Sequence, residues 1–148
     1  KNFKIMKDFV PLEISKKLKE KGFREKCYIH YYPNSKDWFK SSSPECDNYS
    51  SYLDAPTISQ VISWLRQEKK LNVEPCALPS MFVNNIFIDN ADGKVASNSC
   101  TYWNFIIRDM ETGNIKYPGS YERFDCKLFL SYEQAALGGI EFVLDNLI

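Results

Sequence analysis

Apolar residues recur at helical spacing near the start of the 148-residue chain. Val10, Ile14 and Leu18 fall four residues apart and form one stripe of a helix. Pro11 suits the first turn, where its missing N–H costs nothing, and Gly22 is typical of the residue that stops a helix. The pattern therefore predicts a first helix between these two residues.

Two later segments show the same spacing and begin with capping-box pairs, Thr57 with Gln60 and Ser131 with Gln134. The last of these helices contains two adjacent glycines, each of which costs about 1 kcal/mol relative to Ala. Gly139 lies within the apolar stripe, which predicts close approach to a sheet. The sequence offers no such reason for Gly138, which points toward the polar side of the helix.

The rest of the chain alternates in a way that favours strands. The strand candidates are residues 27–32, 71–78, 81–89, 100–109, a turn and return strand within 110–117, and 125–130. Short connections favour antiparallel pairing. We expect one α+β domain over residues 1–148, an antiparallel sheet of about four to six strands packed by three helices. Its order is helix, strand, long loop, helix, strands, helix. Met6 fits an alternative start, which would make residues 1–5 an extension.

Residues 33–56 form the segment that is hardest to assign. They are rich in Ser, Pro, Asn and Asp, yet they also contain large aromatic residues. A structureless loop of this length is uncommon within a compact domain. The segment either contains a short strand near Tyr49 to Leu53 or is a functional loop.

Composition and charge narrow the class of protein. Apolar residues make up 44% of the chain and charged residues 26%, and 19 basic residues balance 19 acidic ones. A nucleic-acid binder usually carries clustered, uncompensated positive charge, so nucleic acid is an unfavoured partner. The sequence shows neither a secretion signal nor an apolar stretch that would span a membrane, which predicts a cytoplasmic protein.

The five cysteines follow no framework of paired spacings. Their odd number predicts free thiols in a reducing compartment. The closest two cysteines, Cys27 and Cys46, are nineteen residues apart, whereas zinc ligands usually come in close pairs. "DNADGK" (89–94) fails the spacing of a calcium loop and fits an Asp-Gly turn. We therefore expect no metal and no cofactor.

The only histidine, His30, lies in the aromatic strand "CYIHYY". Strand alternation places Tyr28, His30 and Tyr32 on one face, with Trp38 and Phe39 on the adjoining loop. Because aromatic side chains dominate interfaces, we interpret these five residues as a candidate binding surface. The alternative is a catalytic His30, which would require a carboxylate or thiol brought to it by the fold.

Three segments resemble a group of uncharacterised proteins carried by prophages and mobile elements of anaerobic gut bacteria: "MKDFVPLEISKKLKEKGF", "APTISQVISWLRQE" and "LSYEQAALGGIEFVLDNLI". They cover both ends of the chain and its middle helix. The resemblance implies a cytosolic, phage-associated accessory protein and assigns no catalytic residue.

We therefore expect an accessory protein that acts by protein–protein or ligand binding, with an unknown protein or a second copy of the chain as partner. A small enzyme with its site near His30 and residues 33–56 is the alternative, and a nucleic-acid binder is third.

Overall fold

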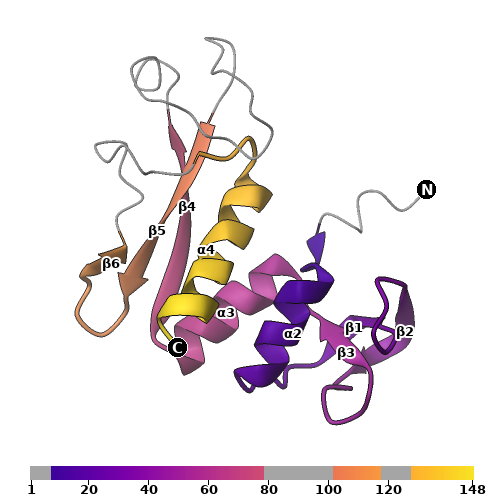
Figure 1. Cartoon of the computed structure of the whole chain (residues 1–148). Coiled ribbons are helices and arrows are strands. Elements are labelled where there is room, and N and C mark those ends of the chain that lie inside the picture. Colours follow the sequence, from indigo (N-terminus) through magenta and orange to yellow (C-terminus); the bar gives the residue numbers. More distant parts are fainter. Residues whose placement is uncertain (1–7, 79–101, 118–127) are drawn as a thin grey trace.

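A computed structural model describes residues 8–78, 102–117 and 128–148 (Figure 1). Its elements are α2 (Leu12–Glu20), β1 (Cys27–Tyr31), β2 (Trp38–Glu45), β3 (Leu53–Ala55), α3 (Ile58–Glu68), β4 (Leu71–Leu78), β5 (Tyr102–Asp109), β6 (Ile115–Tyr117) and α4 (Tyr132–Asn146). The predicted α+β class is confirmed. The strands of the described part divide between two antiparallel sheets, ordered β2-β1-β3 and β4-β5-β6.

Helix α2 lies between Pro11 and Gly22, as the sequence predicts, although its first residue is Leu12 and not Pro11. Pro11 is its N-cap, and Gly22 follows its last turn with a φ of +90°, a conformation that glycine adopts without strain. The backbone N–H of Phe23 donates to the carbonyl of Leu18 (3.0 Å), which satisfies an orphan carbonyl of the helix end. The chain is thereby turned into β1.

The expectation of a long loop over residues 33–56 is wrong for Trp38–Glu45, which forms β2. The short strand expected near Tyr49 to Leu53 lies slightly later in the chain, as β3 (Leu53–Ala55). Strand β2 lies at the edge of its sheet, and most of its side chains face solvent. Its sequence is therefore polar and lacks the apolar alternation that predicts a strand. Together with β1 these strands form the small N-terminal sheet.

The second sheet carries helix α4 on one face (Figure 1). A side chain at Gly139 would place its Cβ 2.5 Å from Val73 Cγ1 and 3.1 Å from Phe105, so the predicted close approach is confirmed. Gly138 has a reason that the sequence did not reveal, because a Cβ there would collide with the Phe129 ring. The expected strand 125–130 lies mostly outside the described residues, but Phe129 bridges to Trp103.

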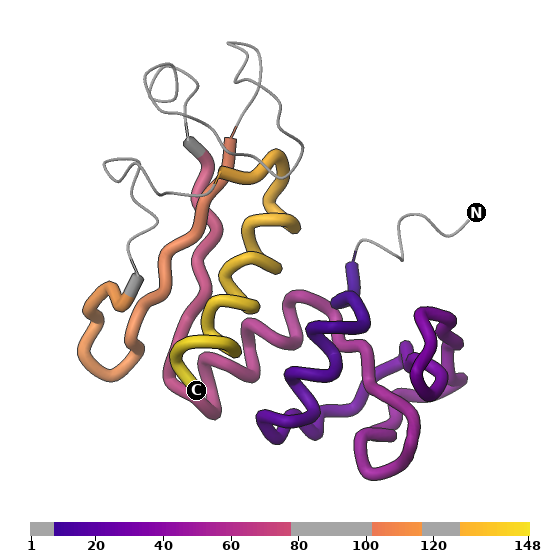
Figure 2. The backbone as a smooth tube through the Cα atoms, viewed as in Figure 1, coloured from indigo at the N-terminus to yellow at the C-terminus, as the bar shows by residue number. Residues whose placement is uncertain are grey.

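Helix α3 connects the two sheets, and α4 contacts both α3 and α2 despite their distance in sequence (Figure 2). Its predicted capping box at Thr57 and Gln60 is confirmed. Ser131 caps α4 as predicted, whereas the Gln134 side chain accepts from the N–H of Leu130 (3.2 Å). Lys17 of α2 pairs with two acidic residues of α4, Glu141 (3.2 Å) and Asp145 (2.9 Å).

Two buried clusters hold these elements. The larger one joins α2, α3, α4 and the second sheet, and the smaller one, which includes Phe9, Leu12 and Tyr31, lies under the first sheet. None of the helices in the described ranges has the length and apolar character needed to cross a membrane. The strand expected at 81–89 and the turn at 89–94 lie outside the described residues.

Candidate functional site

Strand β1 shows the predicted alternation between its two faces. Tyr28 and Tyr32 are 50% and 44% exposed, whereas Ile29 and Tyr31 are buried against the smaller core cluster. The buried face is the one that packs on Phe9. The exposed tyrosines therefore lie on the face expected from the sequence.

Strand β2 divides the five predicted site residues between two places. Its register pairs Trp38 with Tyr31 and Phe39 with His30, so the two adjacent rings project to opposite faces. The Phe39 ring lies 5.0 Å from that of Tyr32 and 5.2 Å from the imidazole of His30, measured between centroids. Trp38 is separated from these rings by the sheet itself.

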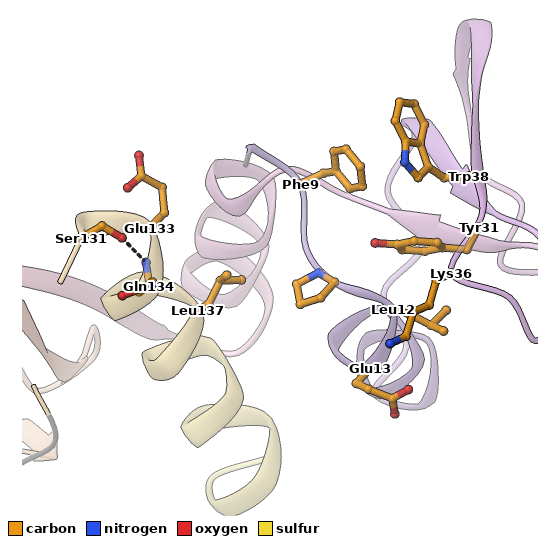
Figure 3. Close-up of a pocket in the computed structure, with 11 residues that line it drawn as sticks. Phe9, Leu12, Glu13, Tyr31, Lys36, Trp38, Ser131, Glu133, Gln134 and Leu137 are labelled. Atoms are coloured by element: carbon orange, nitrogen blue, oxygen red, sulfur yellow. Dashed lines mark hydrogen bonds between the residues drawn. The ribbon is translucent and has the colours of Figure 1, made fainter. Parts of the chain in front are cut away.

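Trp38 lines a pocket of about 740 Å³ (Figure 3). The pocket lies between the N-terminal lobe, which consists of α2 and the first sheet, and the start of α4, which belongs to the second lobe with α3 and the second sheet. One wall is the Phe9 ring, 5.4 Å from Trp38 in an edge-on arrangement, together with Tyr31. The opposite wall is the first two turns of α4, including Leu137. The remaining lining residues are Pro11, Leu12, Glu13, Lys36, Ser131, Glu133 and Gln134.

The pocket combines an apolar wall with a charged rim. The Tyr31 hydroxyl already donates to the carbonyl of Val10 (2.9 Å), and burial raises the pKa of Tyr31 to about 12, so this wall stays neutral. Lys36 and Glu133 form no ion pair with any residue of the described ranges. Among the described residues, the rim therefore offers Lys36 and Glu133, one charge of each sign without an ion-pair partner, beside the aromatic wall.

His30 is completely buried, on the other face of the same sheet. Its Nδ1 lies 2.8 Å from Asp54 Oδ1 and 3.3 Å from Asp47 Oδ2. Its Nε2 lies 3.2 Å from the hydroxyl of Ser41. The fold thus brings two carboxylates to His30. A catalytic His30, the alternative stated from the sequence, requires such a neighbour.

Asp54 is nearly as buried as His30 and also holds the preceding turn. Its carboxylate accepts the backbone N–H groups of Asp47 (2.9 Å) and Asn48 (3.2 Å). The Asn48 side chain in turn donates to the carbonyl of Phe23 (3.0 Å). The loop that covers His30 is therefore fixed by a buried hydrogen-bond network.

Ser41 reaches His30 because β2 is irregular at that point. Cys27 of β1 pairs with Glu45 of β2, and Ile29 pairs with Lys40. A step of two residues along β1 therefore corresponds to a step of five residues along β2, so β2 bulges between Lys40 and Glu45. The Ser41 hydroxyl lies 2.7 Å from the carbonyl of Ser43, the shortest contact at which it donates. Its lone pairs then face Nε2.

The sequence did not single out Ser41, Asp47 or Asp54. The only local sign of Asp54 was a carboxylate inside the apolar triplet "LDA" of β3. Ser41 and Asp47 give no sequence signal, because a bulge and a turn bring them to His30. Burial raises the pKa of both Cys27 and Cys46, which lowers the thiolate fraction of these two thiols.

Comparisons with protein-family models, curated proteins and solved structures give no match, so function is argued from the chain's own geometry.

Proposed function

We propose that this chain is a cytoplasmic, phage- or mobile-element-associated accessory protein that binds an apolar, flat ligand in the pocket of Trp38. The observation that carries the proposal is the pocket itself, where the Phe9–Trp38 ring pair faces Leu137 of α4. The resemblance of three segments to prophage-carried proteins supports the biological setting.

The size and lining of the pocket fit a small ligand. Ligand sites commonly occupy about 300–1,000 Å³, are mostly apolar and contain a few polar groups that orient the ligand. Here the apolar wall of Phe9, Tyr31 and Trp38 would cover a flat body by stacking and edge contacts. Lys36 and Glu133 would orient its polar ends.

The position of the pocket also favours a ligand over a flat protein contact. It lies between two lobes, whereas a stable protein interface needs roughly 800 Å² on each partner and a less concave surface. A ligand there would contact both α4 and the N-terminal sheet. Binding would therefore stabilise the arrangement of the lobes.

The proposal is tested with 1-anilinonaphthalene-8-sulfonate, an aromatic probe with one anionic sulfonate, whose fluorescence rises when its rings bind an apolar surface. Wild-type protein should enhance this fluorescence in a saturable manner, and Trp38→Ala should abolish most of the enhancement. Tyr49→Ala is the matched control, because Tyr49 is 80% exposed and does not line the pocket. Circular dichroism melts establish that each variant is folded.

Two results would contradict the proposal. One is an absence of saturable enhancement by the folded wild type. The other is equal enhancement by Trp38→Ala and Tyr49→Ala, which would place the probe elsewhere.

A second candidate function concerns the opposite face of the sheet. The rings of Tyr32, Phe39 and Tyr52 form a cluster, with centroids 5.0–6.2 Å apart, and Tyr32 is 44% exposed. Exposed tyrosines with little conformational freedom are typical of protein contacts. We propose a second copy of the chain as the partner of this surface.

Light scattering across a concentration series tests the second candidate. A dimer should form in the wild type and dissociate on Tyr32→Asp, while Tyr49→Asp leaves it intact. A wild-type monomer at all concentrations would exclude self-association.

A further inference from the structure

Three electron-pair donors converge at the buried centre of His30. The ring Nδ1 faces Asp54 Oδ1 at 2.8 Å and Asp47 Oδ2 at 3.3 Å, and all three atoms lie within 4.8 Å of one another. The Ser41 hydroxyl donates to Ser43, so it accepts the hydrogen of Nε2–H. Because two lone pairs would repel at 2.8 Å, either a proton or a cation must lie between Nδ1 and the carboxylates.

Backbone N–H groups partly satisfy the Asp54 carboxylate, and the side of the cluster that faces Nδ1 suits a cation. Asp54 is 1% exposed, and neither it nor Asp47 pairs with a Lys or Arg in the described ranges. Buried carboxylates are normally paired with a cation or bound to a metal. A metal ion between the three atoms would supply such a charge.

We propose that His30, Asp47 and Asp54 bind a divalent cation. Ligand atoms at about 2.1 Å from an ion are roughly 3.0–3.4 Å apart in octahedral or tetrahedral geometry. The two measured separations from Nδ1, 2.8 and 3.3 Å, lie close to these values. The site therefore needs little rearrangement to close on an ion.

The donor set indicates the class of ion. One imidazole nitrogen and two carboxylates suit Mn²⁺, Fe²⁺, Co²⁺ or Zn²⁺ better than a soft ion that prefers thiolates. A histidine ligand usually donates its second ring N–H to a fixed acceptor, which sets the tautomer, and Ser41 provides that acceptor. The irregular pairing of β2 thus places the Ser41 hydroxyl beside Nε2 of His30.

The same hydrogen bond argues against a serine nucleophile. Ser41, His30 and Asp54 lie in the order of a hydrolase triad, but the Ser41 hydroxyl donates its hydrogen bond to the Ser43 carbonyl at 2.7 Å and not to Nε2 of His30. Three protein ligands would leave other positions on the ion for water, on the side of the partly exposed Asp47.

The test is metal binding to untagged protein, stripped with chelator and titrated separately with MnCl₂ and ZnCl₂ by calorimetry. Wild type should bind at least one of the two ions at one ion per chain and melt at a higher temperature in its presence. Asp47→Asn should weaken that binding at least about tenfold, since it removes one ligand. Its melting temperature in chelator, compared with that of wild type, measures separately what the loss of the 3.3 Å contact with His30 costs the fold.

Two further variants separate ligation from general effects. Asp37→Asn changes the same charge at an exposed position of the same lobe and should bind the ion as wild type does. Ser41→Ala leaves all three ligands and removes only the acceptor of Nε2–H, so it should weaken binding by about 10–100-fold. Ser41→Ala also keeps the proposal testable if Asp47→Asn is unstable.

The proposal is overturned if folded wild type binds neither ion at this stoichiometry. It is equally overturned if Asp47→Asn and Ser41→Ala bind as tightly as wild type, or if Asp37→Asn weakens binding to the same extent.

Discussion

Asn48 and Asp54 hold each other through reciprocal side-chain and backbone hydrogen bonds. The N–H of Asp54 donates to Asn48 Oδ1 (2.9 Å), and the N–H of Asn48 donates to Asp54 Oδ2 (3.2 Å). Both residues are buried, at 2% and 1% exposure. Because buried polar groups are costly without partners, this pair fixes the loop that covers His30.

The first prediction follows from that pair. Asn48→Ala removes the acceptor of Asp54 N–H and the donor to the Phe23 carbonyl, and both groups stay buried. We expect a loss of about 1–3 kcal/mol in the free energy of unfolding. Urea denaturation measures it, with the exposed Asn146→Ala as control. A loss no larger than that of the control would mean that water replaces the side chain.

The second prediction concerns the contact of α4 with the sheet. Gly139→Leu places a side chain where Val73 and Phe105 already lie, and overpacking should destabilise the protein by about 1–3 kcal/mol. Asn146→Leu adds the same side chain at an exposed position of the same helix and serves as control. Equal denaturation midpoints for the two variants would show that α4 does not pack closely at Gly139.

The third prediction concerns the cysteines, all five of which we expect to be reduced. Cys27, Cys46 and Cys76 are free in the structure, whereas Cys100 and Cys126 lie outside the described residues. Burial raises the pKa of the first three thiols, which lowers their thiolate fraction. Native protein should therefore alkylate slowly at these three positions at about pH 8, as peptide mapping would show.

A thiol count on denatured protein completes that test. Fewer than five thiols without reductant would reveal a disulfide. Fast native alkylation of Cys27, the most buried of the three, would contradict its position in the core.

Local patterns predicted the helices well and the site poorly, for a physical reason. Caps and stripes such as Thr57 with Gln60 act within one turn, so their residues are neighbours in sequence. The centre of His30 depends on contacts over 17 and 24 residues, to Asp47 and Asp54, and on an irregular strand pairing. No local spacing encodes such contacts.

The same limit explains the two adjacent glycines and the aromatic surface. Gly139 lies in an apolar stripe, so its packing was predictable, whereas the reason for Gly138 is Phe129, which precedes the helix. The alternation of β1 predicted that Tyr28 and Tyr32 share a face. It did not predict that Trp38 and Phe39 lie on opposite faces, because β2 was not recognised as a strand.

The last prediction uses the pH dependence of the pocket wall. Burial raises the pKa of Tyr31 from 10.0 to about 12 in the folded chain, so the folded state retains a proton that the unfolded state loses first. The stability that Tyr31 contributes is therefore complete below about pH 10 and is lost as the pH rises toward 12. Tyr31→Phe cannot ionise but lacks the bond to Val10, so wild type should be the more stable by about 1 kcal/mol near neutral pH. Urea denaturation of both proteins should show this difference shrinking across that alkaline range. The ionisation of the other tyrosines affects both proteins equally and does not change the difference. A difference that stays constant would show that the Tyr31 hydroxyl is open to solvent.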